Sequence, residues 1–221
     1  MAGITPKKDV PLSSHTVFRI GGVCRYFYEA RSEEALIEAA DWAAAYELPV
    51  FVLGAGSNIL ASEKGFQGLV VRPVYSDLRV MGNVIHAGAG AMMPHVAAYA
   101  QKEGLSGFEW AIGIPGTVGG SVRGNAGCNG SSMADVVDSV RVYNAAFKRM
   151  KKLSTADCRF GYRDSKFKHH PELVILSAAI GLHPGGREAI TEKMREYSLH
   201  RVATQDIGSQ CAGCVFKNIP W

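Results

Sequence analysis

The sequence predicts a mixed α+β protein with two sub-domains and a short C-terminal stub. Residues 25–72 alternate strand and helix patterns within one compact unit, and beyond residue 73 the pattern changes to strands interrupted by helices and glycine-rich turns. The chain has 221 residues, of which 47% are hydrophobic and 20% charged. This is the composition of a globular protein with room for one large or two small domains.

The first unit begins with a predicted strand at residues 25–30. Ser32 is the expected N-cap of the helix that follows, because its hydroxyl can accept a hydrogen bond from an unpaired backbone N–H. The apolar face of this helix is expected to comprise Leu36, Ala39, Ala40 and Ala43. The uninterrupted apolar run 49–53 predicts a strand buried on both faces, and residues 68–72 predict the strand that completes the unit.

The second unit contains predicted strands and helices along its whole length. Strands are expected at residues 84–87, 136–143 and 173–182. Helices are expected at residues 96–103, ending at Gly104, and from Arg187 to about His200, after Gly185-Gly186. The residues beyond this last helix have no clear hydrophobic period and form the stub.

Composition and charge narrow the classes of partner. The net charge of +4 is mild and fits anionic small molecules as well as it fits nucleic acid. The basic run 148–152 is expected at the solvated tip of a hairpin and not in a nucleic-acid patch, and no nucleic-acid partner is expected. No apolar run is long enough to span a membrane, and the N-terminus lacks the apolar core of a secretory signal, so neither membrane association nor secretion is expected. Five cysteines without framework spacing favour a reducing cytoplasm.

Segment 113–127 is the most informative part of the chain, because it holds six glycines in fifteen positions. Glycine loses more backbone entropy on folding than any other residue, so such a segment needs positive φ angles or a backbone that lies directly against another surface. Phosphate groups and flat cofactor rings are common reasons for such an approach. A flexible linker is disfavoured because linkers are polar, whereas Ile114, Val118 and Val122 lie within this segment.

Two further glycine-rich turns follow predicted strands. Residues 54–58 present consecutive backbone N–H groups, which can hold a pyrophosphate as readily as they can form an ordinary tight turn. Ile59 stands where the dinucleotide-binding fingerprint of doubly wound folds requires a third glycine, and no P-loop motif occurs. With Gly88 and Gly90 in the other turn, the three segments suggest a dinucleotide held in an extended pose between the sub-domains.

Three other features have both a structural and a functional interpretation. Arg163, within the aromatic segment 160–167, can stabilise a developing oxyanion with its rigid fork of donors, or can form a structural salt bridge. Cys211 and Cys214 form a C-x-x-C motif without a second ligand pair or a preceding strand. A coincidental pair with one functional cysteine is therefore favoured over a zinc or redox site. The pair His169-His170 is expected in a polar loop.

Taken together and in order, these segments resemble those of the UDP-N-acetylenolpyruvoylglucosamine reductases, the MurB family of peptidoglycan biosynthesis. Segment His15-Thr16-Val17-Phe18-Arg19-Ile20-Gly21-Gly22 is close to the N-T-x-R-x-G-G opening of the family. The resemblance continues through segments 53–60, 107–109, 113–127 and 162–165. It ends at Gly213-Cys214-Val215-Phe216-Lys217-Asn218. The order of these motifs over about residues 10–218 makes the resemblance specific.

The resemblance implies an α+β FAD-binding fold of the vanillyl-alcohol-oxidase (PCMH) type. FAD-binding sub-domains are expected at residues 1–72 and 73–184, and the start of a substrate-binding sub-domain at residues 185–221. Family members continue well beyond this point, so the third sub-domain is expected to be mostly missing. With it goes a glutamate thought to help stabilise the enol. A monomer is expected.

The implied activity is reduction of the enolpyruvyl group of UDP-N-acetylenolpyruvoylglucosamine to give UDP-N-acetylmuramate in the cytoplasm. Non-covalently bound FAD is the implied cofactor, NADPH is the implied electron donor, and no metal is implied. Arg163 would face the developing enolate. The proton donor of the family is usually a serine, and here that position is Cys214. A thiol with its ordinary pKa of about 8.5 is mostly protonated at neutral pH and can donate.

The remaining site residues are also implied by the resemblance. Tyr162, Lys217 and Asn218 would contact the substrate. FAD would be held by Arg163 together with Leu53, Gly54, Ala55, Gly56, Ser57, Asn58, Ile59, Gly88, Gly90, Ile114, Pro115, Gly116, Thr117, Gly119, Gly120, Ser121, Asn125 and Gly127.

Two alternatives stay open on sequence grounds. The first is a truncated flavin-binding remnant with little or no reductase turnover, favoured by the missing third sub-domain and opposed by the presence of Arg163 and Cys214. The second is an FAD-dependent oxidase of the same broad fold, in which the flavin is often tethered covalently. Cys128 is the thiol close to the glycine-rich segment in sequence.

Overall fold

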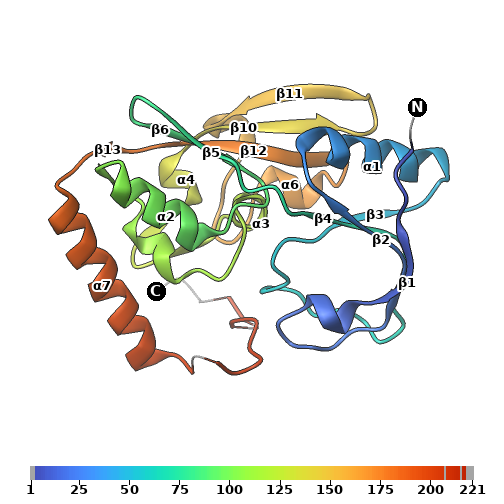
Figure 1. Ribbon diagram of the computed structural model, residues 1–221, viewed down its shortest axis with the longest axis horizontal. Helices are drawn as coiled ribbons and strands as arrows, with labels where there is room; N and C mark the ends of the chain where they lie inside the picture. The colour runs from blue at the N-terminus through green and yellow to red at the C-terminus, as the bar shows by residue number, and fades with distance from the viewer. Residues whose placement is uncertain (1–2, 207, 215, 218–221) are drawn as a thin grey trace.

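Two β-sheets, built from successive parts of the chain, organise the computed structural model of the protein, which describes residues 3–206, 208–214 and 216–217 (Figure 1). The first sheet has the strand order β1-β2-β4-β3 and comprises β1 (Lys7–Pro11), β2 (Val23–Ala30), β3 (Val50–Val52) and β4 (Phe66–Pro73). The second has the order β11-β10-β12-β6-β5 and comprises β5 (Leu78–Met81), β6 (Val84–Gly88), β10 (Val137–Asn144), β11 (Arg149–Ser154) and β12 (Leu173–Gly181).

Helix α1 (Glu33–Ala45) follows the prediction closely. The Ser32 hydroxyl accepts a hydrogen bond from Ala35 N at 3.1 Å, which caps the helix, and two glutamates occupy the first turn, where the helix dipole favours negative charge. The predicted apolar face is buried and comprises Leu36, Ala39, Ala40 and Ala43. The helix packs on β2 and β4, which confirm the strands expected on either side of it.

The prediction of a strand buried on both faces after α1 is wrong. β3 lies at the edge of the first sheet, parallel to β4, and Phe51 is 37% exposed. Val50, Phe51 and Val52 line a cavity between the two sheets. The apolar run therefore forms the wall of a cavity and not the centre of a sheet.

The second sheet is antiparallel and is covered on one side by helices (Figure 1). α2 (Met93–Lys102) packs against η2 (Glu109–Gly113) and α7 (Arg187–Thr204), and α3 (Val118–Gly124) packs against β12. The strands expected at 84–87, 136–143 and 173–182 are confirmed as β6, β10 and β12, and the two expected helices as α2 and α7.

The glycine-rich segment 113–127 contains regular structure that its composition did not predict. Thr117 is the N-cap of α3, and its hydroxyl accepts a hydrogen bond from Gly120 N at 3.4 Å. Within this segment, which the structure describes fully, the positive φ belongs to Asn125 and to none of the glycines. Close approach explains two of them: a Cβ on Gly119 would lie 3.0 Å from that of Ala89, and one on Gly127 would lie 2.4 Å from the Ser131 carbonyl oxygen.

The basic run 148–152 extends beyond the hairpin tip where it was expected. Lys148 lies in the turn between β10 and β11, and Arg149 to Lys152 are exposed residues of the edge strand β11. Charged side chains on an edge strand oppose pairing with another chain. The run therefore has a structural explanation that needs no partner.

The two sheets share one hydrophobic core. Buried side chains run without a break from Leu36 of α1 to Ile180 of β12. Two polar contacts tie α1 to β10: Tyr143 Oη donates to Asp41 Oδ1 at 2.6 Å, and Arg141 pairs with Glu33 at 2.9 Å. The boundaries 1–72, 73–184 and 185–221 stay predictions; the strands of the first sheet end at Pro73, one residue past the first boundary, and those of the second sheet lie within 73–184.

Short elements complete the fold. They are η1 (Leu12–His15), β7 (Leu105–Ser106), β8 (Gly127–Cys128), β9 (Ser131–Ser132), α4 (Met133–Val136), α5 (Thr155–Cys158), α6 (Lys166–His169) and β13 (His183–Pro184). Within the described part of the chain, none of the helices has the length and apolar character needed to cross a membrane.

Candidate cofactor and substrate site

The three glycine-rich segments meet at one place. A Cβ on Gly54 would lie 2.6 Å from Thr117 Oγ1, so the turn after β3 packs directly on the glycine-rich segment. Gly119 N donates to Ala89 O at 2.9 Å, which joins that segment to the turn after β6. The convergence expected from sequence is therefore present, although the contacts that produce it are between protein groups.

The turn at residues 54–58 leaves backbone donors without acceptors. Among the described residues, none of its five N–H groups donates a hydrogen bond to protein. Gly56 has a φ of +68°, and a Cβ there would lie 2.1 Å from the His15 carbonyl oxygen, so only glycine fits. Buried or half-buried backbone N–H groups normally have partners, and successive unpaired ones form a concavity that binds anions.

A cavity opens beside this turn, between the edge of the first sheet and the second sheet. Its walls are mainly apolar, with one cation, and its lining includes Val50, Phe51, Val52, Gly54, Thr117, Gly119, Gly120, Arg123, Phe167, Leu173, Val174 and Ile175. Arg123 and the apolar residues of β3, α6 and β12 were not predicted from sequence. No local signal in the sequence marks them, because the edge position of β3 follows from strand pairing between distant segments.

This combination fits a dinucleotide such as FAD. The unpaired N–H groups at 54–58 suit a pyrophosphate, and the apolar walls suit a flat ring system. Gly54, Thr117, Gly119 and Gly120 belong to both the expected FAD residues and the cavity lining. The residues that are present can therefore hold the group.

Other expected FAD residues have a clear role in packing. Leu53 is 1% exposed, its N–H donates to Val71 O, and its side chain belongs to a small core with Cys24 and Phe27. A Cβ on Gly88 would lie 2.8 Å from the ring of Tyr75, which explains the absence of a side chain there. The same holds for Gly90, where a Cβ would lie 2.5 Å from the Tyr75 carbonyl oxygen.

The remaining expected FAD residues lie along the same loops. Ser57 is half-buried, and a Cβ on Gly116 would come within 3.8 Å of Ser57 Oγ. Ser121 is 4% exposed inside α3. Backbone hydrogen bonds fold residues 114–116 into a tight turn, because Gly116 N donates to Ile114 O at 2.9 Å. Ala55 and Ile59 are half-buried, Asn58 is exposed, and Pro115 is exposed at the tip of its turn.

Arg163 lies in a tight turn against the end of the glycine-rich segment. Its Nη2 donates to Gly127 O at 2.7 Å, and its Nη1 donates to Asn125 O at 3.4 Å. The guanidinium also lies over the Tyr162 ring, 5.4 Å from the centroid. The structural salt bridge considered from sequence is not among the ion pairs of the described residues.

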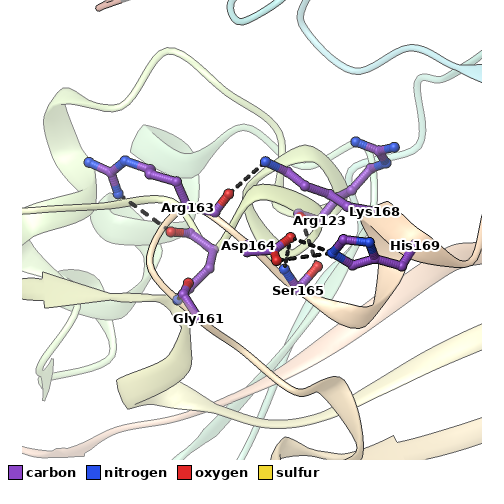
Figure 2. A network of polar contacts seen from close by, with 8 residues as sticks. Arg123, Gly161, Arg163, Asp164, Ser165, Lys168 and His169 are labelled. Carbon is purple, nitrogen blue, oxygen red and sulfur yellow. Dashed lines mark hydrogen bonds and ion pairs between the residues drawn. The ribbon is translucent and has the colours of Figure 1, made fainter. Parts of the chain in front are cut away.

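A network of polar contacts surrounds this turn (Figure 2). Lys168 Nζ donates to Arg163 O at 2.6 Å, and Ser165 Oγ donates to Arg123 O at 2.6 Å. Asp164 pairs with His169 at 3.0 Å, and this hydrogen bond lowers the pKa of the Asp164 carboxyl. His169 and His170 thus each have a carboxylate partner, the second being Glu172 at 3.0 Å.

The described C-terminal site residues, Cys214 and Lys217, are exposed. Partial burial lowers the pKa of Lys168, Asp164 opposes that shift, and the Lys217 cation lowers the pKa further, so Lys217 lies within electrostatic reach of Lys168. Cys211 and Cys214 are free, exposed thiols. Tyr162 is 53% exposed, and Asn218 lies outside the described residues. No group of three or more metal-binding side chains occurs in the described part of the chain.

Cys128 does not have the surroundings of a reactive thiol. Its Sγ donates to Trp110 O at 3.1 Å, and burial raises the pKa of the thiol against the opposing effects of Arg201 and Arg163. Nucleophilic attack requires the thiolate, which burial disfavours. The geometry therefore argues against a covalent tether between Cys128 and a flavin.

Comparison with known proteins also indicates an FAD-binding protein. A family model described as an FAD binding domain matches residues 24–146. The crystal structure of UDP-N-acetylenolpyruvylglucosamine reductase (MurB) from Thermus caldophilus has a TM-score of 0.83 and 30% identity, over 98% of this chain and 76% of its own. Cholesterol oxidase from Brevibacterium sterolicum, at 12% identity and a TM-score of 0.60, shares the fold alone. Fold and site define an FAD-binding protein of the vanillyl-alcohol-oxidase (PCMH) type.

The relatives give the family. A protein of Caldicellulosiruptor bescii is 39% identical over 99% of this chain, and one of Synechococcus sp. strain RCC307 is 36% identical over 98%. This chain spans 70% and 72% of their respective lengths. Both are UDP-N-acetylenolpyruvoylglucosamine reductases by name. The chain belongs to this family of FAD oxidoreductases, the MurB family, as its motifs predicted.

Proposed function

We propose that this protein uses NADPH and non-covalently bound FAD to reduce the enolpyruvyl group of UDP-N-acetylenolpyruvoylglucosamine. The product is UDP-N-acetylmuramate, made for peptidoglycan in the cytoplasm. One observation carries the proposal: the glycine-rich segment packs on Gly54, in the turn whose N–H groups are unpaired, and ends at the carbonyls that accept hydrogen bonds from Arg163. A dinucleotide held by the N–H groups of residues 54–58 would therefore lie close to the Arg163 guanidinium.

The backbone of residues 54–58 would hold the FAD pyrophosphate, and Thr117, Gly119 and Gly120 would line the ring pocket. When bound there, FAD supplies the capacity to accept a hydride from a reduced nicotinamide and pass it to a carbon of the substrate. The apolar side chains of β3 and β12 would exclude water from one side of the cavity.

Arg163 would stabilise negative charge that develops on the substrate. A guanidinium is always charged and has five N–H donors, of which the Asn125 and Gly127 carbonyls take two. Donors fixed before the reaction stabilise a developing oxyanion most effectively, and loss of one typically slows the chemical step about 10²- to 10³-fold. An enolate oxygen beside Arg163 would gain this stabilisation.

Cys214 would donate a proton from Sγ to the α-carbon of the enolate, which completes the lactyl ether. Its exposure leaves the thiol accessible, and the electrostatic reach between Lys217 and Lys168 supports a return of this segment to the Arg163 turn. Tyr162, Lys217 and Asn218 would contact the substrate. These assignments follow from the family motif, and the C-x-x-C pair would then contain one functional thiol.

Anaerobic stopped-flow absorbance tests the proposal. The protein, reconstituted with FAD, is mixed with NADPH or NADH and then with the enolpyruvyl substrate, while the visible flavin band is followed. Bleaching by NADPH in preference to NADH, with recovery on adding substrate, is expected. Bleaching without recovery would indicate the alternative, a flavin-binding protein with little turnover, and failure to bind FAD would overturn the proposal entirely.

The Cys214→Ala variant tests the proton donor. Flavin reduction by NADPH is expected to stay within about twofold of wild type, while reoxidation by substrate slows about 10²- to 10⁴-fold, the range for loss of a general acid. Cys211→Ala is the matched control, because it removes the other thiol of the motif and should leave both half-reactions intact. Equal losses in both half-reactions of Cys214→Ala would contradict the assignment.

A further inference from the structure

The turn that carries Arg163 has a conformation that needs external support. Gly161 and Asp164 exchange two backbone hydrogen bonds, at 3.0 and 3.1 Å, which close the turn. Arg163 has a φ of +54°, in the left-handed region that residues with a side chain rarely adopt. Such backbones persist where surrounding contacts over-determine them. The question is which residue provides those contacts.

Asn125 ties this turn to the end of α3. Its Nδ2 donates to Gly161 O at 2.8 Å, and its Oδ1 accepts from Ala134 N at 3.0 Å. One partner is an acceptor and the other a donor, so the orientation of the amide is fixed. The residue is 6% exposed, and both ends of its side chain are committed to protein. Its side chain therefore differs from the cofactor contact that the family resemblance implied.

The backbone of the same residue receives the guanidinium. Asn125 O accepts from Arg163 Nη1, two residues before Gly127 O accepts from Nη2. Asn125 itself has a φ of +43° at the C-terminal end of α3, a conformation that asparagine adopts more readily than most residues. Glycine would also fit this backbone conformation but has no side-chain amide, and an aspartate carboxylate has no N–H group to donate to Gly161 O. The position requires both properties, which asparagine combines.

We propose that Asn125 is a positioning residue for Arg163. Its side chain holds the turn at residues 161–164, its carbonyl holds the guanidinium, and it acts on the reaction through Arg163 without touching FAD or substrate. This inference rests on the proposed function, in which Arg163 stabilises the enolate. Displacement of a reacting or stabilising group by about 1 Å can slow a reaction about 100-fold, so a loosened turn would affect the substrate step selectively.

A double-mutant cycle on the FAD-bound protein tests the inference. Asn125→Gly, which keeps the left-handed backbone, is expected to slow flavin reoxidation by substrate about 10- to 100-fold and to leave reduction by NADPH and FAD affinity within about twofold. In an Arg163→Ala background, Asn125→Gly should cause no further slowing. A further slowing there, or an equal loss in both half-reactions, would overturn the inference.

A second readout does not depend on turnover. Peptide mass spectrometry measures how fast phenylglyoxal modifies Arg163 in the FAD-bound protein, and modification should be several-fold faster in Asn125→Gly and in Asn125→Asp. Asn129→Gly is the matched control: Asn129 also has a left-handed φ of +53°, but its amide faces Cys128 Sγ, so Arg163 should react at the wild-type rate. Unchanged reactivity in the Asn125 variants would overturn the inference. If the wild-type protein shows no turnover but the Asn125 variants still make Arg163 more reactive, the proposed function is overturned and the positioning role of Asn125 is not.

Discussion

Two glycine-rich turns of similar sequence follow β3 and β6, and their backbones behave differently. In the turn at residues 54–58, no N–H group finds an acceptor among the described residues. In the other turn, Gly88 N donates to Asp77 O at 3.0 Å and Ala89 N to Leu176 O at 2.9 Å. The first turn has donors to offer a ligand, whereas the glycines of the second make room for Tyr75 and Pro73. Glycine content alone does not identify a ligand site. What distinguishes the two turns is whether their backbone N–H groups already have acceptors in the protein.

The largest expected effect comes from adding one methyl group to the first turn, at Gly56. Gly56→Ala places a side chain against the His15 carbonyl at a φ of +68°, where left-handed strain alone costs about 1–2 kcal/mol. Because the turn must move to accommodate the methyl group, we expect this variant to bind FAD about 100-fold more weakly or worse. A tenfold change in the dissociation constant corresponds to about 1.4 kcal/mol of binding free energy. Affinity is measured by quenching of flavin fluorescence on binding.

Gly90→Ala is the control for that experiment. A Cβ there would lie 2.5 Å from the Tyr75 carbonyl oxygen, so the variant should also lose stability, measured by denaturant unfolding of the FAD-free protein. Its FAD affinity, however, should stay within about threefold of wild type. If both variants lose affinity to the same degree, the distinction between the two turns fails.

Removal of FAD provides a direct comparison of the two backbones. Hydrogen exchange followed by mass spectrometry should show strong FAD-dependent protection at residues 54–58 and little change at Gly88, Ala89 and Ala91, whose N–H groups already donate to protein. A cofactor present at 100 times its dissociation constant adds about 2.7 kcal/mol to the free energy of unfolding, so the melting temperature should fall by several degrees on its removal. Protection that is equal in the two turns would contradict the assignment of the pyrophosphate to the first.

A smaller effect is expected where the first turn packs on α3. Thr117→Val keeps the shape of the side chain but removes the cap, which typically costs about 1 kcal/mol. FAD affinity should also fall, because Gly54 packs against this side chain and Thr117 lines the cavity. Ser154→Ala removes a comparable cap from α5, outside the cavity lining, and should lower stability alone. Denaturant unfolding and FAD titration of both variants separate the two effects.

Local patterns were sufficient for much of the fold. Ser32 and the spacing of Leu36, Ala39 and Ala43 specify α1 through a cap and a helical period, and the structure has both. β3 was misinterpreted because an apolar run reads the same whether it is covered by protein or lines a cavity. Distinguishing these requires knowledge of which strand lies at the edge of the sheet, which depends on pairing between distant segments.

The site was predictable in its residue types but not in their partners. Arg163 and the 54–58 turn were singled out because a guanidinium is charged in any environment and consecutive backbone N–H groups can bind an anion. Asn125 was also singled out, yet its amide binds Gly161 and Ala134, which are 36 and 9 residues away in the chain. Gly88 and Gly90 were attributed to a ligand when Tyr75 occupies the space beside them. Such contacts follow from tertiary packing, which no local motif records.

The smallest expected effect is a pH dependence beneath the first turn. The His15 ring stacks on Phe27 at 4.2 Å, its Nδ1 lies 3.4 Å from Arg72 Nη1, and its carbonyl oxygen abuts Gly56. Burial lowers the pKa of His15, Arg72 and Lys7 lower it further, and Glu29 opposes them. The turn after β6, residues 88–91, contains glycine and alanine alone and has no titratable side chain. The pH dependence is therefore expected for the first turn and not for the second.

Because the folded-state pKa of His15 lies below the unfolded value of about 6.5, the unfolded chain takes up the proton first as the pH falls. The contribution to stability is therefore intact above pH about 6.5 and declines below it, until the folded His15 is protonated as well. Denaturant unfolding of the FAD-free protein between pH about 8 and about 5 should show this decline. It should be shallower in His15→Gln, which cannot take up the proton. Identical slopes for the two proteins would show that acid acts on the first turn through groups other than His15.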